Sequence, residues 1–213
     1  MNHKKSISLI LVLILTFTIP TISYSYDLYS AVVWSDGYSV IGPGGQECIC
    51  YALTNTSDYN ISIGMTTEFL DENKSNIGTS SAYIYCLGGG QTTYIYAVNN
   101  FSESKSSSTL FSLNKAENDS AVNALEYGEI FEYDDSITFN VINRSSETVY
   151  HPQLTVVFKK DNVPVAITSG TFHADDESNS IAGNNGCGSV NVTIPAGVEY
   201  DTYSPFITAF YAG

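Results

Sequence analysis

Basic residues are scarce in this sequence: 8 Lys and Arg face 22 Asp and Glu, which gives a formal net charge of −14 at pH 7. Acidic side chains are repelled by the phosphates of a nucleic acid and by anionic lipid heads. We therefore expect neither a nucleic acid nor a membrane surface as a partner. In a chain rich in Ser, Thr and Asn, this net charge favours solubility.

Groups that carry catalysis are also few. The chain has three histidines, and it lacks the Gly-x-Ser-x-Gly, His-Glu-x-x-His and phosphate-cradling motifs. His151 is expected to be structural or solvated. A solvated loop is expected around His173, although this loop is a weak candidate for cation binding: the candidate residues are His173, Asp175, Asp176 and Glu177. We predict a protein that is not an enzyme and that has no cofactor and no metal site.

Only one long apolar run is present, from Ile7 to Ile19. It is shorter than the ~20 residues of a membrane span, and it follows the basic residues Lys4 and Lys5, as in a signal peptide. We predict a cleaved signal over residues 1–25. The mature protein would be secreted, without membrane insertion, and its association with a cell surface stays open. It would carry 6 basic residues against 22 acidic ones.

Helical periodicity is missing, and alternation of apolar and polar residues takes its place. Residues 61–69 alternate in this way, and residues 154–158 repeat the pattern. Segments that turn easily separate such runs, for example Asn184-Asn185-Gly186. The pattern predicts an all-β protein of antiparallel sheets, with about seven strands in each of two modules.

The two modules are predicted from an internal repeat. Its five matched pairs are residues 30–32 with 120–122, 49–55 with 137–143, 66–69 with 155–158, 94–98 with 190–194, and 108–111 with 204–207. The mature chain then divides into β-sandwich domains at 26–117 and 118–213, each large enough for a core of its own.

A family resemblance accompanies the repeat. Asn55-Thr56-Ser57, the strand that ends in Thr67-Glu68-Phe69-Leu70-Asp71, and a final aromatic strand resemble the bacterial extracellular FxLYD-type immunoglobulin-like domains. Asn143-Arg144-Ser145 and Val157-Phe158-Lys159-Lys160-Asp161 resemble a more distant member. The resemblance covers about residues 47–113 and 137–210. It implies a tandem of extracellular sandwiches without a catalytic site.

Four cysteines follow the predicted signal, and their even number in an exported chain favours disulfides. The candidates are Cys48, Cys50, Cys86 and Cys187. Alternation along the strand places Cys48 and Cys50 on its outer face, about 6.6 Å apart, a poor geometry for a bond to each other. We predict that one cysteine of this pair, Cys50 in preference to Cys48, bonds to Cys86. The other would bond to Cys187 and link the two modules covalently. Free thiols and a cross-link between chains are the alternatives.

Tyrosine is abundant, with 16 residues. Tyr83 and Tyr85 alternate along one expected strand, and Tyr94 and Tyr96 along the next. The match of 94–98 to 190–194 favours core packing for these side chains. The alternative is an aromatic ladder for a sugar or a protein.

Two functions remain after these exclusions. The first is a noncatalytic extracellular binding or adhesion module, a monomer whose partner is an unidentified protein or glycan. The second is a structural subunit of wall, matrix or pilus-like material that assembles by β-strand addition.

Overall fold

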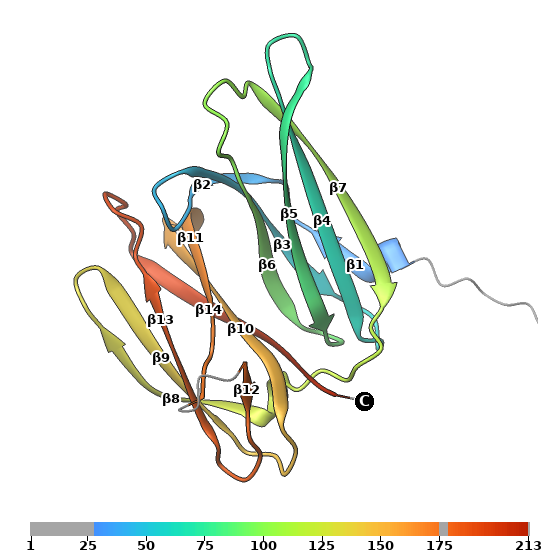
Figure 1. Cartoon of the computed structure of the whole chain (residues 1–213), viewed down its shortest axis with the longest axis vertical. Coiled ribbons are helices and arrows are strands. Elements are labelled where there is room, and N and C mark those ends of the chain that lie inside the picture. The colour runs from blue at the N-terminus through green and yellow to red at the C-terminus, as the bar shows by residue number, and fades with distance from the viewer. Residues whose placement is uncertain (1–27, 175–178, 213) are drawn as a thin grey trace, which may run out of the picture.

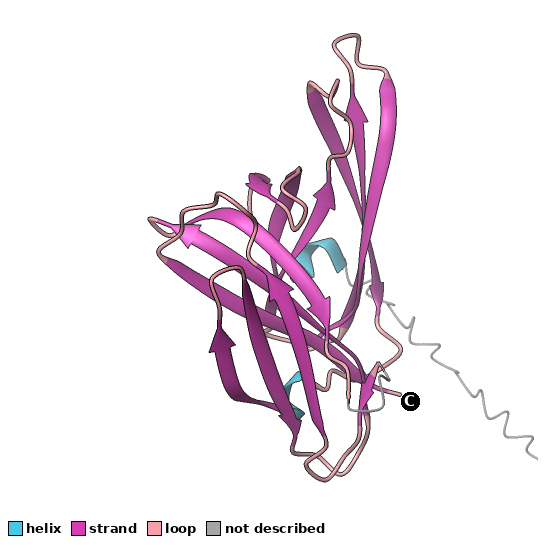
Figure 2. Cartoon of the chain, turned by 60° about the vertical axis from the view of Figure 1, so that its left-hand side comes forward, coloured by secondary structure: helices cyan, strands magenta, loops and turns pink. Residues whose placement is uncertain are grey.

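A computed structural model describes residues 28–174 and 179–212. The predicted signal over 1–25 and the acidic residues Asp175, Asp176 and Glu177 lie outside the described residues. We call residues 28–117 the first half and the described residues from 118 onward the second half. Figures 1 and 2 show the halves side by side, each built almost wholly of strands.

The described chain is all-β, as predicted, and its only helical elements are two 3₁₀ turns, η1 (Leu28–Ala31) and η2 (Val122–Ala124). The strands of the first half are β1 (Val32–Trp34), β2 (Tyr38–Ile41), β3 (Glu47–Asn55), β4 (Ile61–Leu70), β5 (Asn76–Leu87), β6 (Thr92–Val98) and β7 (Ser106–Lys115). Those of the second are β8 (Leu125–Glu132), β9 (Ser136–Asn143), β10 (Val149–Lys160), β11 (Val163–Thr171), β12 (Ser180–Ile181), β13 (Cys187–Thr193) and β14 (Thr202–Tyr211).

The strands pair in the same way in both halves. In the first, β3 pairs with β6, and β4 lies between β5 and β7. In the second, β9 pairs with β13, and β10 lies between β11 and β14. These ladders are antiparallel. Each half therefore has two sheets, whose facing apolar side chains form a separate buried cluster, around Phe69 in the first half and Phe158 in the second.

A buried asparagine recurs at the same place in each half. The Asn55 side-chain amide donates to the Tyr59 carbonyl at 2.6 Å and to the Leu87 carbonyl at 2.9 Å. Asn143 donates in the same way, to the Glu147 carbonyl at 2.7 Å and to the Ile181 carbonyl at 3.0 Å. Each amide ties the turn after its own strand to a segment farther along the chain, which satisfies buried carbonyls that would otherwise cost stability.

The Asn-x-Ser sequence explains why these turns close. The backbone N–H groups of Ser57 and Ser145 each donate to the oxygen of the asparagine two residues earlier, at 3.0 Å in both turns. Their hydroxyls donate to the same oxygen, at 2.7 and 2.8 Å. This is the local side-chain geometry that Asn favours in turns.

The halves meet through the outer faces of two sheets. A single parallel pair, Ile41 with Ala166, links β2 to β11. The sheet of the first half and the sheet of the second half that this pair joins pack on each other through their outer faces. Their contact is an apolar cluster around Cys48, Cys50, Val157 and Ile167, which are fully buried. Tyr94 packs on Phe206 with ring centroids 5.1 Å apart. The halves are therefore held together by apolar burial.

Candidate functional site

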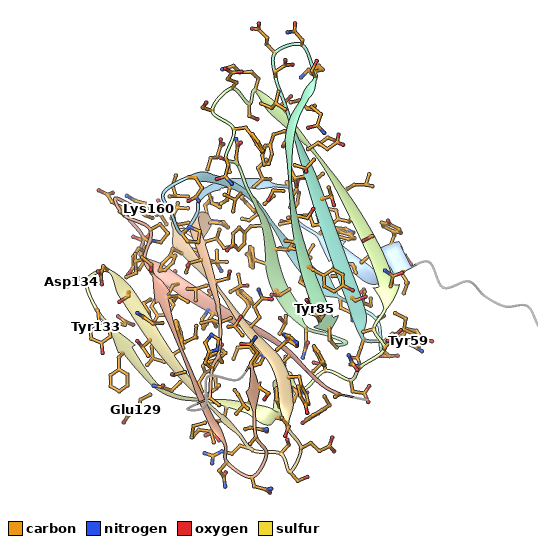
Figure 3. All side chains as sticks on the ribbon, in the orientation of Figure 1. Tyr59, Tyr85, Glu129, Tyr133, Asp134 and Lys160 are labelled. Carbon is orange, nitrogen blue, oxygen red and sulfur yellow. The ribbon has the colours of Figure 1, made fainter. Side chains whose placement is uncertain are left out.

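Exposed aromatic side chains gather where β5 meets the ends of β10 and β14. Tyr83 and Tyr85 project from the outer face of β5, and they are 45% and 53% exposed. Their ring centroids are 4.9 Å apart in an edge-on arrangement. Figure 3 shows Tyr85 near the junction of the halves, well away from Tyr133 at the far rim of the second half.

The aromatic run continues into the second half. The Tyr85 ring stacks on the His151 ring with centroids 5.3 Å apart, and His151 stacks on Phe210 at 5.6 Å. Phe210 in turn stacks on Tyr150 at 6.4 Å. The run from Tyr83 to Tyr150 therefore crosses from one half to the other, and the position of its rings depends on how the halves are docked.

An unusual backbone conformation places His151 in this run. Its φ is 44°, a region that side chains with a Cβ rarely adopt, and the residue precedes a proline, which further restricts it. The pairing of β10 with β14 shifts register between Tyr150 and Gln153, and such irregularities redirect side chains. Its backbone N–H donates to the Asn179 carbonyl at 2.9 Å. Strain of this kind is a feature of binding and switch sites.

Three depressions meet at Tyr83, which lines all of them. The first, which we call the interdomain cleft, has a volume of about 260 Å³ between the halves, and its polar lining includes Tyr94, Tyr96, Gln153, Thr155, Ser169 and Thr208. Its walls are fixed in part by the hydrogen bond between the Tyr96 hydroxyl and Ser169 Oγ, at 2.8 Å.

The second, the Gly64 depression, is a hollow of about 360 Å³ on the outer face of β4, β5 and β7. Gly64 pairs with Tyr83 on one side and Ser112 on the other. A Cβ at Gly64 would lie 2.6 Å from Ser112 Oγ, so the hollow depends on glycine. Leu110, which is 75% exposed, forms part of its wall.

The third, the Asn114 depression, lies on the other side of Tyr83 and has a volume of about 600 Å³. Its lining includes Ser62, Tyr85, Asn114, Lys115 and Glu117. Lys115 and Glu117 are the only Lys, Arg, Asp or Glu residues in the linings of the three depressions. In a chain with 30 such residues, this surface is chemically distinct: aromatic faces, hydroxyls and amides with little charge.

The predicted disulfides are not present, and all four cysteines are free thiols. Cys48 and Cys50 do lie on the outer face of their strand, as predicted, but this face is buried against the second half. Cys86 lies on the other sheet of its half, with Sγ 3.5 Å from the Asn118 carbonyl oxygen. Cys187 is exposed at the start of β13. Cys48 and Cys50 therefore share the contact between the halves, whereas Cys86 and Cys187 lie elsewhere. Burial raises the pKa of Cys50 to about 12.

The predicted inward orientation of the tyrosines is also wrong. Ile84 points into the core of the first half, and Tyr83 and Tyr85 on either side of it point outward. Ile95 and Ala97 are likewise the core residues of β6, which leaves Tyr94 and Tyr96 facing the second half. Aliphatic residues between the tyrosines were the sequence signal that could have found this surface.

His173 is exposed, and its backbone pairs with Ser189. The structure does not describe Asp175, Asp176 and Glu177, with which it would form the candidate cation loop. Within residues 28–174 and 179–212, no three His, Cys, Asp or Glu side chains are grouped so as to hold a metal ion. The same residues include no helix long and apolar enough to cross a membrane.

Comparison with known proteins adds no family: neither a protein-family model nor a curated protein matches the sequence.

Proposed function

We propose that this chain is a noncatalytic binding protein that is exported and acts outside the cell, and that its ligand contacts the surface around Tyr83. One observation carries the proposal: exposed aromatic rings, hydroxyls and amides from both halves converge on three adjoining depressions. Exposed aromatic side chains provide a large contact area at a low cost in conformational entropy. A surface formed by two docked parts is also a common place for ligand sites.

In this proposal the halves are tandem immunoglobulin-like β-sandwich domains of the FxLYD type, with residues 26–117 and 118–213 as the two domains. The matching strand pairing and the matching Asn55 and Asn143 turns support it. Export is supported by the apolar run near the N-terminus. In a bacterial host that secretes the full-length chain, the mass of the released protein should correspond to a start at Tyr26. A mass that retains residues 1–25 would contradict this part of the proposal.

The alternative is a structural subunit that assembles by β-strand addition. Assembly through the faces of the sheets has less support, because stacking of further copies in the manner of the halves would need apolar outer faces. The exposed face of β4 and β5 instead carries Glu68 and Thr79 as a cross-strand pair, and the outer face of β9 and β13 carries Thr138 opposite Asn191. Polar pairs of this kind favour contact with water.

Binding can be tested with the secreted protein on arrayed extracellular polymers: neutral and charged polysaccharides, poly-L-proline and a collagen-like polypeptide. Replacement of Tyr83 and Tyr85 by alanine should remove the binding signal, since these rings provide exposed contact area. Tyr133→Ala is the matched control, because Tyr133 is 59% exposed on the far rim. Binding that survives the loss of both tyrosines, or no binding to any polymer, would contradict the proposal.

A further inference from the structure

The three depressions around Tyr83 have linings that specify a class of ligand. The linings of the interdomain cleft and the Gly64 depression include no Lys, Arg, Asp, Glu or His residue. A charged ligand would lose hydration there without gaining a partner. The net charge of −14 also repels an anionic polymer. The chemistry of the linings therefore favours a neutral ligand.

Hydroxyl groups dominate the polar part of these linings. Thr66 and Ser81 bond to each other at 3.3 Å beside the Gly64 depression, and Ser112 lies on its other side. Each hydroxyl both donates and accepts hydrogen bonds. A sugar presents hydroxyls of the same dual capacity around its ring, together with C–H groups on its faces. A polyproline helix presents carbonyl acceptors without backbone donors, so it uses only half of this capacity.

The position of Tyr83 bears on the length of the ligand. Its ring is shared by the interdomain cleft, the Gly64 depression and the Asn114 depression. A ligand that fills more than one of them must pass this ring, and aromatic faces stack on apolar surfaces of similar size. Continuity with the contact between the halves adds Tyr85 and His151 beyond it.

We propose that the ligand is an extended, uncharged glycan, with sugar units in the interdomain cleft and the Gly64 depression on either side of the Tyr83 ring. This inference rests on the proposed function, because it names the ligand class of the same surface. Tyr83 provides the stacking face, Gly64 provides the room for a sugar ring, and Gln153 in the cleft provides an amide that bonds to sugar hydroxyls.

Affinity electrophoresis of the full secreted chain tests it, with gels containing a neutral β-glucan, a neutral mannan, a neutral α-glucan or anionic polygalacturonate. At least one neutral polysaccharide should retard the protein, and polygalacturonate should not. Tyr83→Ala, Gly64→Val and Gln153→Leu should each weaken retardation by about tenfold, equivalent to the loss of one good contact.

Two control variants separate loss of a contact from loss of the fold. Tyr133→Ala removes an exposed tyrosine elsewhere, and Gly128→Val adds a side chain where a Cβ meets its nearest neighbour, Asn140, at an ordinary 3.5 Å. Both should leave retardation unchanged within about twofold, a small free energy. Circular dichroism and thermal unfolding should show every variant folded, and Gln153→Leu gives a test of the cleft that does not alter the Gly64 depression.

The inference is overturned if no neutral polysaccharide retards the protein, or if Tyr83→Ala and Gly64→Val leave retardation by a neutral polysaccharide unchanged. Direct binding to poly-L-proline, measured on the polymer array described above, separates this failure from that of the proposed function. Binding of poly-L-proline that depends on Tyr83 and Tyr85, without glycan binding, would retain a binding protein and refute the glycan. Binding that depends on neither tyrosine would refute both.

Discussion

Two sheet faces in this molecule have the same strand layout and opposite surroundings. The outer face of β5, β4 and β7 in the first half is open, whereas the outer face of β11, β10 and β14 in the second half is buried against the first. The strand registers of the two faces also match. Thr66 has Ser81 and Leu110 as its cross-strand partners, and Thr155 has Ser169 and Phe206. The difference between the faces is therefore one of side chains.

The clearest difference in side chains is at a central pair. On the open face Glu68 is paired with Thr79, and on the buried face Val157 is paired with Ile167. Phe206, which packs on Tyr94, has Leu110 as its open counterpart. Two aliphatic residues in place of a carboxylate and a hydroxyl make one face a contact between halves, while the other stays available for a ligand, because burying an unpaired charge is costly.

The largest effect on stability is expected when a residue of the buried face is replaced by its counterpart on the open face. Val157→Glu would bury a carboxylate without a partner and should lower the free energy of unfolding by about 4 kcal/mol. Denaturation in urea measures this. The reverse change, Glu68→Val, should alter stability by no more than about 0.5 kcal/mol, as for other surface substitutions. A Val157→Glu variant as stable as the unmodified protein would mean that this contact does not hold the halves.

The aromatic counterparts give a second, smaller contrast. Phe206→Ala should lower the free energy of unfolding by about 2–3 kcal/mol, because it leaves a cavity against Tyr94. The loss stays moderate because the Phe206 side chain is only partly buried. Leu110→Ala should cost no more than about 0.5 kcal/mol, since Leu110 is 75% exposed. Thermal and urea unfolding of both variants would measure the contrast. Equal losses would refute the difference in burial between the faces.

The asparagine turns test how alike the halves are. Asn55→Ala and Asn143→Ala should each lower the free energy of unfolding by about 1–3 kcal/mol, because each leaves buried carbonyls without a donor. Asn140→Ala is a control, since its single bond, to the Glu129 carbonyl, is exposed. If only one of the two turns matters to stability, the matching hydrogen bonds conceal a difference between the halves.

Alkaline pH gives the smallest effect and reports on the contact between the halves. Burial raises the pKa of Cys48 to about 11 and that of Cys50 to about 12, from an ordinary value of 9.0, with a further contribution from Glu47 and from Cys48, respectively. The unfolded chain therefore releases these protons at a lower pH than the folded one. The thiols leave stability unchanged below about pH 9 and lower it as the pH rises from there to about 12.

The double variant Cys48→Ala/Cys50→Ala should show a shallower loss of stability over this pH range. Some loss will remain, because burial also raises the pKa of Tyr94 and Tyr96 at the same contact. Cys187→Ala is the control for loss of a cysteine away from this contact, because its thiol is exposed. A double variant with an unchanged slope would mean that the thiols ionise as easily in the folded protein as in the unfolded one.

Sequence reasoning succeeded where alternation was read along one strand. The apolar parity of residues 61–69 and 154–158 placed Met65 and Val156 in the two cores, and parity also placed Cys48 and Cys50 on the outer face of theirs. It failed where residues 94–98 were aligned with residues 190–194. Tyr94 was matched to Val190, but Ile95 pairs with Tyr51 as Val190 pairs with Phe139. An error of one residue exchanges the two faces of a strand.

The candidate site was beyond such reasoning for a related reason. Tyr85 and His151 come from different halves, and their stacking depends on the docking of the halves and on the register shift in β10. No local pattern in the sequence predicts either. The disulfide prediction failed for a related reason, because the packing decides which thiols meet: Cys48 and Cys50 are buried in the contact between the halves, Cys86 lies on the other sheet of its half, and Cys187 is exposed.

By itself the sequence determined that this chain is β-rich, which face of residues 61–69 and of residues 154–158 is buried, and that acidic groups outnumber basic ones. Those properties follow from local periodicity and composition, which depend on neighbouring residues alone. Only the tertiary structure decided which outer face is covered, where the thiols lie, and that Tyr83 borders a cleft between the halves. These depend on the packing of surfaces distant in the chain, and a few side chains, such as Glu68 and Val157, decide whether that packing occurs.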